Sequence, residues 1–333
     1  MHRQINALWQ IDLELTAVSQ LLVQGTQMYG QPGAFYQARH PDTGKETCCI
    51  PASTLKGVWR SAAEQILRSF ADWLACDPFA DKPENNAGGK SHPPPGCSCS
   101  SRLEKDERIN TPQIYSALCP ACRLFGATVH AGLLRVEDSW LQDDLLPDTK
   151  TGIAIDRFTG GVKQGALFTL KPLPIGARFA TRMTLINPEL WQIGLLALVC
   201  REMDEGRVRL GSGTRKGLGY VRATWWRATL RYPRVRYAAH VPHGTGRIVS
   251  ANRLADVAGE GLDPAVLPDV APLENTHWSA GEWIEYDIRG QDLAELRRAC
   301  VEDALAPRLR EGYTGFDYAD PCPHAPVANG ESV

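Results

Sequence analysis

The chain has 333 residues, of which 43% are hydrophobic and 22% are charged, and its formal net charge is −2. This length and composition suit a globular protein of one large or two modest domains and exclude wholesale disorder. No run of about 18 apolar residues occurs, and the N-terminus lacks an apolar signal core, so we expect a cytoplasmic protein with no membrane partner.

The small net charge conceals an uneven distribution. Residues 206–255 contain eleven Lys or Arg and no Asp or Glu, which leaves 25 basic and 38 acidic side chains, or −13, in the remainder. Such a basic segment suggests a polyanionic partner such as nucleic acid. The alternative is a solvated segment whose cations pair with acidic side chains elsewhere in the fold.

Hydrophobic periodicity predicts an alternation of strands and helices. In chain order, we expect a strand at 7–23, a loop at 25–47, a helix from 51, a strand at 133–141, a hairpin at 153–170, a strand at 178–186, an amphipathic helix at 188–203 and a strand at 220–230. Without its insertions, this is the ferredoxin-like βαββαβ order, whose sheet is also the platform of the RNA-recognition motif. The expected fold class is therefore α+β, with a further helix at 293–309.

The first predicted helix has the clearest pattern, and Ser53 or Thr54 can act as its N-cap. Its apolar stripe comprises Leu55, Val58, Trp59, Ala62, Ala63, Ile66, Leu67, Phe70 and Trp73. Lys56 and Arg60 project from the opposite face together with Glu64, where solvent or a ligand must meet them.

Ten cysteines in a chain of this kind favour metal ligands or reduced thiols over disulfides. Residues 76–110 show no periodicity and belong to a predicted insertion at 76–125 that is short of apolar material. The predicted ligands are Cys97, Cys99, Cys119 and Cys122. Four thiolates at this spacing can hold a structural Zn²⁺ ion, which would fix the shape of the insertion. Cys76 and His92 are spare ligands, and free thiols are the alternative.

A glycine-rich loop lies within the basic segment. Its glycines allow the backbone to approach another molecule, and its cations suit a phosphodiester chain. A nucleotide-binding P-loop would continue from Gly-Lys to Ser or Thr before a helix, whereas here Gly217 follows Lys216, so we exclude it. The predicted RNA contacts are Gly211, Ser212, Gly213, Thr214, Arg215, Lys216 and Gly217. A mobile loop without a ligand is the alternative.

The predicted strand that follows this loop interleaves cations with aromatic residues. Arg222, Trp225, Trp226 and Arg227 can stack on bases and neutralise phosphates. Strand alternation favours a simpler interpretation for Trp225, in which it packs into the core while Arg227 faces solvent.

Five segments in chain order resemble the repeat-associated mysterious protein (RAMP) superfamily of CRISPR systems, in particular the backbone subunits of type III and type IV effector complexes. The segments are 50–60, 119–126, 155–161, 176–179 and 211–219. The resemblance extends over residues 8–230. It implies a crRNA-binding subunit that polymerises along the guide as a helical filament, with a β-hairpin thumb that inserts into the duplex of guide and target. Some relatives also hold zinc near the insertion.

The resemblance implies roles for particular residues and segments. Lys56 and Arg60 would contact the guide backbone with the glycine-rich loop, and Phe158, Val162 and Lys163 would lie on the thumb. Residues 1–237 would form the ferredoxin-like RAMP core, with the zinc-knuckle-like insertion at 76–125 and the thumb at 150–170. Residues 238–333 would be a C-terminal extension and tail. The partners would be crRNA, a guide-matched target DNA or RNA, further copies of the chain and other CRISPR effector subunits.

The resemblance also bears on catalysis. Type III backbone subunits that cut target RNA carry an aspartate in the loop between the first strand and the first helix. Residues 25–36 of this chain contain no Asp, Glu or His, although cleavage needs a positioned acid or base. We therefore expect a non-cleaving, type IV-like subunit. The alternatives are a type III ribonuclease that uses Asp42, a crRNA-processing endoribonuclease that uses His40, and an unrelated RNA-binding or zinc protein.

Overall fold

Strand β1 (Leu8–Ala17) lies inside the largest sheet, where it pairs antiparallel with β10 (Arg178–Ile186) on one side and with β11 (Val221–Pro233) on the other. Strands β6 (Leu134–Val136) and β7 (Ser139–Leu141) both pair with the far side of β10. One helix follows β1 and another follows β10. This antiparallel order confirms the predicted ferredoxin-like α+β fold, with the single predicted strand at 133–141 split into two.

The computed structural model describes residues 5–25, 33–71, 74–77, 98–103, 111–233, 247–249, 270–272, 277–280, 282–312 and 316. At one end of the sheet, β15 (Trp283–Ile288) pairs with β11, and β14 (His277–Ala280) pairs with β15. At the other end, β3 (Glu46–Ile50) pairs with β7, and β2 (Gln37–Arg39) pairs with β3. The predicted loop at 25–47 therefore contains strands. The smaller strand pairs are β4 (Gly126–Ala127) with β5 (His130–Ala131), β8 (Lys150–Ile155) with β9 (Val162–Leu170), and β12 (Arg247–Val249) with β13 (Val270–Pro272).

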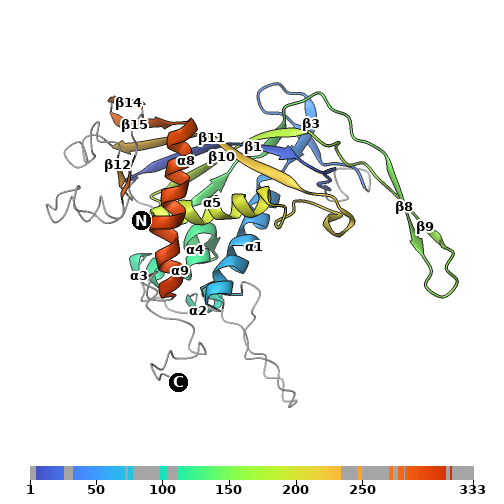
Figure 1. Ribbon diagram of the computed structural model, residues 1–333, viewed down its shortest axis with the longest axis horizontal. Coiled ribbons are helices and arrows are strands. Elements are labelled where there is room, and N and C mark those ends of the chain that lie inside the picture. Colours follow the sequence, from blue (N-terminus) through green and yellow to red (C-terminus); the bar gives the residue numbers. More distant parts are fainter. Residues whose placement is uncertain are drawn as a thin grey trace, which may run out of the picture.

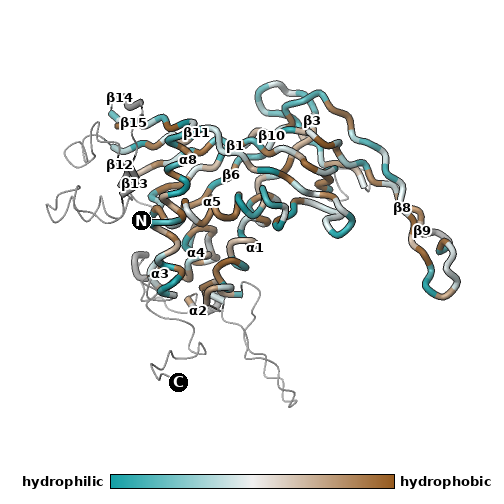
Figure 2. Tube along the Cα trace, viewed as in Figure 1, coloured by the Kyte–Doolittle hydropathy of each residue, from teal (hydrophilic) through white to brown (hydrophobic). Residues whose placement is uncertain are grey.

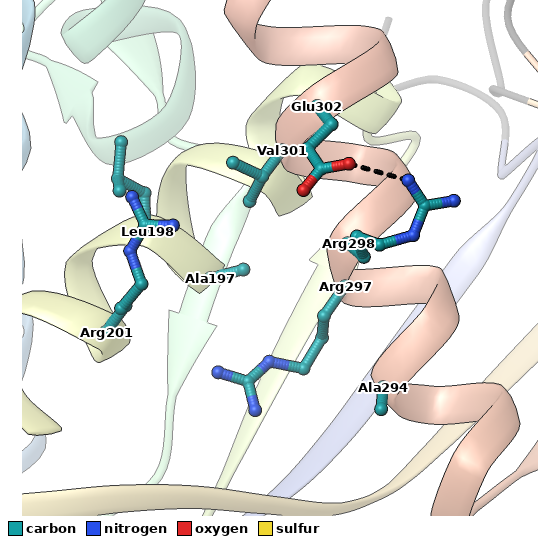
Figure 3. A pocket seen from close by; sticks show the side chains of 8 residues that line it. All are labelled: Ala197, Leu198, Arg201, Ala294, Arg297, Arg298, Val301 and Glu302. Atoms are coloured by element: carbon teal, nitrogen blue, oxygen red, sulfur yellow. Dashed lines mark hydrogen bonds and ion pairs between the residues drawn. The ribbon is translucent and has the colours of Figure 1, made fainter.

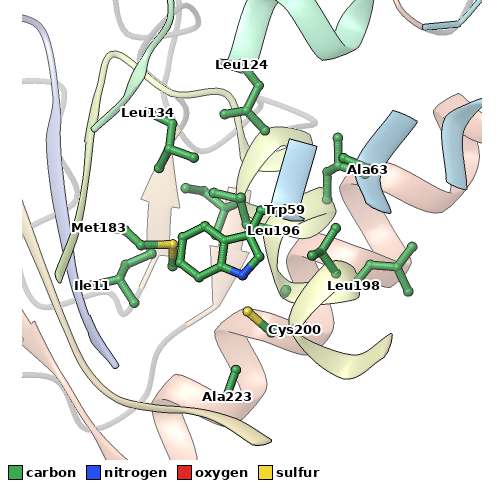
Figure 4. Close-up of a cluster of buried hydrophobic side chains, with 14 of the residues drawn as sticks. Ile11, Trp59, Ala63, Leu124, Leu134, Met183, Leu196, Leu198, Cys200 and Ala223 are labelled. Carbon is green, nitrogen blue, oxygen red and sulfur yellow. The ribbon is translucent and has the colours of Figure 1, made fainter. Parts of the chain in front are cut away.

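Helices α1 (Ala52–Phe70) and α5 (Leu190–Asp204) lie on the same side of the sheet (Figure 1). Trp59 of α1 is completely buried, and its indole N–H donates to Met203 Sδ at 3.2 Å. Figure 4 shows Trp59 among Ile11, Ala63, Leu124, Leu134, Met183, Leu196 and Leu198. The core thus joins the sheet to both helices, because the apolar stripe of α1 and the inward face of β1 meet there.

The start of α1 differs from the prediction. The helix begins at Ala52, Pro51 occupies the N-cap position without a side-chain hydrogen bond, and neither Ser53 nor Thr54 caps it. Instead, the carboxylate of Asp138, in the connection between β6 and β7, accepts from the N–H of Ala52 at 2.7 Å. An acceptor far away in the sequence therefore satisfies the N–H of Ala52, which has no acceptor within its own helix. Of the predicted apolar stripe, Phe70 is exposed, and Trp73 lies outside the described residues.

The described residues also form the helices α2 (Cys99–Leu103), α3 (Thr111–Ala117), α4 (Pro120–Phe125), the short 3₁₀ turn η1 (Thr214–Lys216), α8 (Gly290–Ala299), the π-helical turn η3 (Cys300–Leu305) and α9 (Ala306–Glu311). The last three form a nearly continuous rod that packs against α5. Helix α5 is therefore buried between the sheet and this rod, and the prediction of a one-sided amphipathic helix is wrong. No helix in the described part of the chain is long and apolar enough to cross a membrane.

Gly194 allows the close approach of α5 and η3. A Cβ at Gly194 would lie 2.2 Å from the backbone oxygen of Cys300, whereas one at Gly57 in α1 would meet no atom within 4 Å. We therefore expect opposite effects from the same substitution. Gly194→Ala should destabilise the chain by about 1–3 kcal/mol through overpacking, and Gly57→Ala should stabilise it by up to about 1 kcal/mol through helix propensity. Urea denaturation without RNA measures both, and a higher midpoint for Gly194→Ala would contradict the packing described.

Candidate functional site

The hairpin of β8 and β9 projects from the rest of the molecule (Figure 1). Its turn is held by Asp156, whose Oδ1 accepts hydrogen bonds from the backbone N–H groups of Phe158 at 2.8 Å and Thr159 at 3.0 Å. The N–H groups of Thr159 and Phe158 stabilise the carboxylate and so lower the pKa of Asp156. A turn fixed by its own side chain gives the tip a defined shape.

Hydrophobic residues lie along this projecting hairpin (Figure 2), and several of them are exposed. Phe158 at the tip is 100% exposed, and Ile155, Val162 and Leu167 are also exposed. Lys163 lies exposed beside Val162. An isolated two-stranded hairpin is marginally stable, and clustered exposed apolar residues mark a binding surface. The residues predicted for the thumb therefore lie together on one projecting element.

The glycine-rich loop packs against its own chain at its base. The N–H of Ser212 donates to the backbone oxygen of Leu22 at 2.7 Å. A Cβ at Gly211 would lie 2.2 Å from that oxygen, and one at Gly219 would lie 2.3 Å from the backbone oxygen of Leu210. Both glycines have positive φ. They permit close approach within the protein, whereas the sequence suggested approach to another molecule.

The tip of the loop faces outward. The turn η1 lies between Gly213 and Gly217, which both adopt left-handed backbone. Within the described part of the chain, the N–H groups of Thr214 and Arg215 have no hydrogen-bond partner. The side chains of Arg215 and Lys216 are exposed. The tip therefore offers amide donors and cations together, which are the groups that bind a phosphodiester.

Lys216 joins the loop to the hairpin. Its Nζ lies 4.3 Å from the centre of the Phe168 ring in β9, a cation–π contact. The ring lies over Gly152 in β8, where a Cβ would be 2.2 Å from it. Two segments that are distant in the sequence thus form one surface. Sequence reasoning missed Phe168, whose only signal is that it faces a glycine across the predicted hairpin.

The structure neutralises part of the basic segment. Its ion pairs are Arg207 with Glu202 and Glu205, Arg227 with Asp287, and Arg231 with Glu285. Arg215, Lys216 and Arg222 form no ion pair with any described residue. The alternative interpretation of paired cations therefore holds for three arginines. Among the residues whose side chains the structure describes, the cations of the segment without an ion pair are those on the glycine-rich loop, Arg222 at the start of β11, and Arg209, which lies over the Tyr220 ring.

The open face of the sheet is not a basic platform. Trp225 is buried as expected, and its indole N–H donates to Cys200 Sγ at 3.3 Å. Trp226 is exposed, as strand alternation predicts for the neighbour of the buried Trp225, and a bulge in β11 then shifts the buried side to Ala228 and Leu230. Asp12 of β1 pairs with Arg182 of β10 at 2.6 Å across this face. Ion pairs of this kind leave little charge on the sheet for phosphates.

Lys56 and Arg60 have partners within the protein. Lys56 Nζ donates to the backbone oxygen of Leu134 at 2.9 Å, and burial, followed by the nearby Arg60, lowers its pKa. Arg60 donates to Glu64 at 2.8 Å and to the backbone oxygen of Gly126 at 3.0 Å. The expectation that this face meets only solvent or ligand is wrong for Glu64, which is buried. Arg60 also lines an open cavity of about 380 Å³.

Four buried cysteines come together next to α1, in the region of α2 and α4. Their sulfur atoms all lie within 4.8 Å of one another, and they belong to Cys76, Cys99, Cys119 and Cys122. The structure thus brings together three of the predicted ligands and adds Cys76, which the sequence offered as a spare. Cys97 and His92 lie outside the described residues. The four are not disulfide-bonded.

This cluster fits a metal ion. A tetrahedral ion with Zn–S bonds of about 2.3 Å would separate the sulfurs by about 3.8 Å, and Cys76 Sγ lies 3.5 Å from Cys122 Sγ. The sulfurs also have second-layer donors, since the N–H of Cys119 points to Cys99 Sγ at 3.3 Å and Arg60 to Cys122 Sγ at 3.6 Å.

The acidity of the thiols agrees with this role. Hydrogen bonds from Cys119 and the other two thiols lower the pKa of Cys99, while hydrogen bonding to neighbouring sulfurs and burial raise the pKa of Cys119. The thiols therefore cannot all ionise together, since the single guanidinium of Arg60 beside Cys122 does not neutralise four adjacent negative charges. A bound cation removes this conflict.

The candidate catalytic residue lies on an exposed turn. Asp42 follows β2, and its backbone N–H donates to His40 Nδ1 at 3.2 Å. The His40 ring packs on Trp140, with centroids 4.8 Å apart. No described side chain donates to the Asp42 carboxylate. Among the described residues, therefore, no hydrogen-bonded acid–base pair of side chains includes Asp42.

Comparison with protein-family models finds a match to the RAMP superfamily over residues 14–222. No curated protein gives a significant match. The matched region contains the end of the first strand, both core helices, the hairpin and the glycine-rich loop. Since it covers more than half of the chain and its fold is the ferredoxin-like one observed, the chain belongs to the RAMP superfamily of CRISPR-associated RNA-binding proteins.

Proposed function

We propose that this chain is a backbone subunit of a CRISPR effector ribonucleoprotein, which binds crRNA, polymerises along it and does not cleave. Its partners are the guide RNA, a guide-matched target, further copies of the chain and other effector subunits. The target is selected by base pairing with the guide. Membership of the RAMP superfamily supports the RNA-binding part of this proposal.

The contact between Lys216 and Phe168 is the observation that carries the proposal. It unites the amide donors and cations of the loop tip with the apolar hairpin in one surface. The loop suits the phosphate backbone of a guide, while Phe158, fully exposed, suits insertion between stacked bases. A single strand that crossed this surface would meet both kinds of group.

The other segments have supporting roles in this proposal. Residues 1–237 form the RAMP core and carry the RNA contacts, with the thumb at 150–170. The extension at 238–333 contributes β15 and the rod of α8, η3 and α9, which cover β11 and α5. The insertion at 76–125 holds a structural zinc ion through Cys76, Cys99, Cys119 and Cys122. Lys56 connects α1 to β6 through the backbone oxygen of Leu134, and Arg60 connects α1 to the cysteine cluster through Cys122. Arg60 would contact RNA at the open cavity that it lines.

The assembled complex tests whether the chain cleaves. Incubation with guide-matched RNA should leave that RNA intact, because Asp42 forms no hydrogen-bonded acid–base pair with a described side chain. Regularly spaced cuts that disappear in Asp42→Ala would replace the non-cleaving subunit with a target ribonuclease of the type III kind.

Removal of the two cations at the loop tip should weaken RNA binding and flatten its salt dependence. For Arg215→Ala combined with Lys216→Ala, we expect the slope of log K against log salt to fall by about 1.4, since each phosphate contact to a single strand contributes about 0.7. Fluorescence anisotropy with a labelled single-stranded guide RNA over a salt series gives the slope.

The control removes the same number of cations at two arginines that already form ion pairs within the protein. Arg207 and Arg289 are exposed but form ion pairs within the protein, so Arg207→Ala with Arg289→Ala should leave the slope unchanged. An unchanged slope in the Arg215 and Lys216 variant would remove the loop from the RNA-binding surface.

A further inference from the structure

A small cavity lies where the C-terminal rod meets α5, largely beyond the region that the RAMP family model matches (Figure 3). Its volume is about 240 Å³. Ala197 and Leu198 of α5 and Val301 of η3 form its apolar lining, with Arg201 and Arg297 at its edge. Pockets for small-molecule ligands usually measure about 300–1,000 Å³, so this cavity suits a single protruding side chain.

The charge at the edge of this cavity is positive. Arg298 is paired with Glu295 and Glu302, which neutralises the only carboxylate that lines the cavity. Arg297 lies over the Trp225 ring at 5.0 Å. Arg201, by contrast, forms no hydrogen bond or ion pair through its guanidinium with any described residue, although, after the larger effect of Arg207, its charge helps to lower the pKa of Glu202. An apolar side chain flanked by a carboxylate would therefore complement this cavity.

The loop after β7 presents such a side chain. Leu146 is 81% exposed, more than any other large hydrophobic residue that the structure describes outside the hairpin. Asp144 and Asp148 flank it, and both are exposed. The exposed Ile175, at 66%, has no acidic residue within two positions on either side.

This loop is held rigidly at both ends. Arg178 binds Asp143 through its backbone N–H at 2.9 Å and its guanidinium at 2.7 Å. At the other end, the N–H of Asp148 donates to the backbone oxygen of Pro172 at 2.8 Å. A fixed knob loses little entropy when it is bound.

We propose that Leu146 of one copy inserts into the cavity between α5 and the rod of the next copy, where Asp144 pairs with Arg201. This inference rests on the proposed polymerisation and adds the interface that carries it. Knob and cavity are different surfaces of the same chain, so the contact is heterologous and propagates from copy to copy. It also places the C-terminal extension, which contributes one wall of the cavity, in the assembly.

A charge swap tests the pairing. Arg201→Asp and Asp144→Arg should each reduce cooperative assembly on an RNA long enough for several copies by about tenfold or more, because like charges then face each other. The chain that carries both changes should assemble again, since the pair is restored with reversed polarity. Leu146→Asp should also block assembly, while Ile175→Asp, the same kind of change at another exposed aliphatic residue outside the interface, should not. Sedimentation velocity and anisotropy give the assembly state and affinity.

A truncated RNA that holds a single copy separates this interface from RNA binding. The single variants should bind it as the unaltered chain does. Single variants that assemble normally, or a double variant that fails to recover, would overturn the interface. A loss of single-copy affinity in Arg201→Asp would also overturn it and would assign the cavity to nucleic acid. If the unaltered chain binds no RNA, the proposed function fails. The interface is then tested without RNA, by sedimentation velocity of the unaltered chain and the same variants, and it is overturned if the charge changes do not affect self-association.

Discussion

Cys119→Ser is expected to lower the free energy of unfolding by about 5 kcal/mol or more, since the binding of structural zinc to small domains contributes about 10 kcal/mol or more at neutral pH. Cys119 is fully buried, and its sulfur lies in the four-cysteine cluster that joins the end of α1 to α2 and α4. Without a cation, burial and mutual repulsion keep the thiols from ionising together. The segments that carry them then lose their common attachment.

Elemental analysis and thermal denaturation test this expectation together. The unaltered chain should contain one zinc ion per chain, and a strong chelator should lower its melting temperature. Cys48→Ser is the matched control, because Cys48 is equally buried but lies outside the cluster; it should retain the zinc. A chain that contains no zinc, and whose melting temperature does not change with the chelator, would show that the cluster consists of four reduced thiols without a metal.

Trp59→Ala is expected to destabilise the chain by about 3–5 kcal/mol, the usual cost of replacing a large buried aromatic side chain with alanine. Trp59 is completely buried between the sheet, α1 and α5 (Figure 4). Replacement by alanine would remove these contacts and create a cavity, which relaxation of the surrounding side chains would fill only partly. RNA binding should be lost only to the extent that the protein unfolds, because Trp59 does not reach the surface.

Denaturant titration measures the loss, with Trp226→Ala as the control. Trp226 belongs to the same residue type but is exposed on β11, so its replacement should change stability by less than about 1 kcal/mol. At low denaturant, the folded fraction of Trp59→Ala should bind guide RNA with unaltered affinity. A midpoint equal to that of the unaltered chain would contradict the burial of Trp59.

The periodic patterns predicted the core of the fold. Strand alternation in β1 and β10, and the apolar stripe of α1, reflect which side chains face the interior, so their sequences carry the information. The start of α1 was not predictable in this way, because its first amide is satisfied by Asp138, a residue far away in the sequence. The burial of α5 on both sides was also hidden, since it depends on the C-terminal rod.

The candidate site shows the same division. Residue types and spacing predicted three of the four cysteines in the cluster, Cys99, Cys119 and Cys122. The order of short motifs predicted the RAMP superfamily, whose model matches residues 14–222. The choice of Cys76 as the fourth member required the end of α1 to be placed in space.

By itself, the sequence determined the fold class, the superfamily and the chemical character of the basic segment, because these depend on local pattern and residue type. Only the tertiary structure decided which cations are neutralised, as Arg227 and Arg231 meet carboxylates on β15, a strand contributed by a distant segment. It likewise decided that the loop and the hairpin form one surface, through Lys216 and Phe168. Contacts between distant segments depend on how the whole chain packs, and no local pattern encodes them.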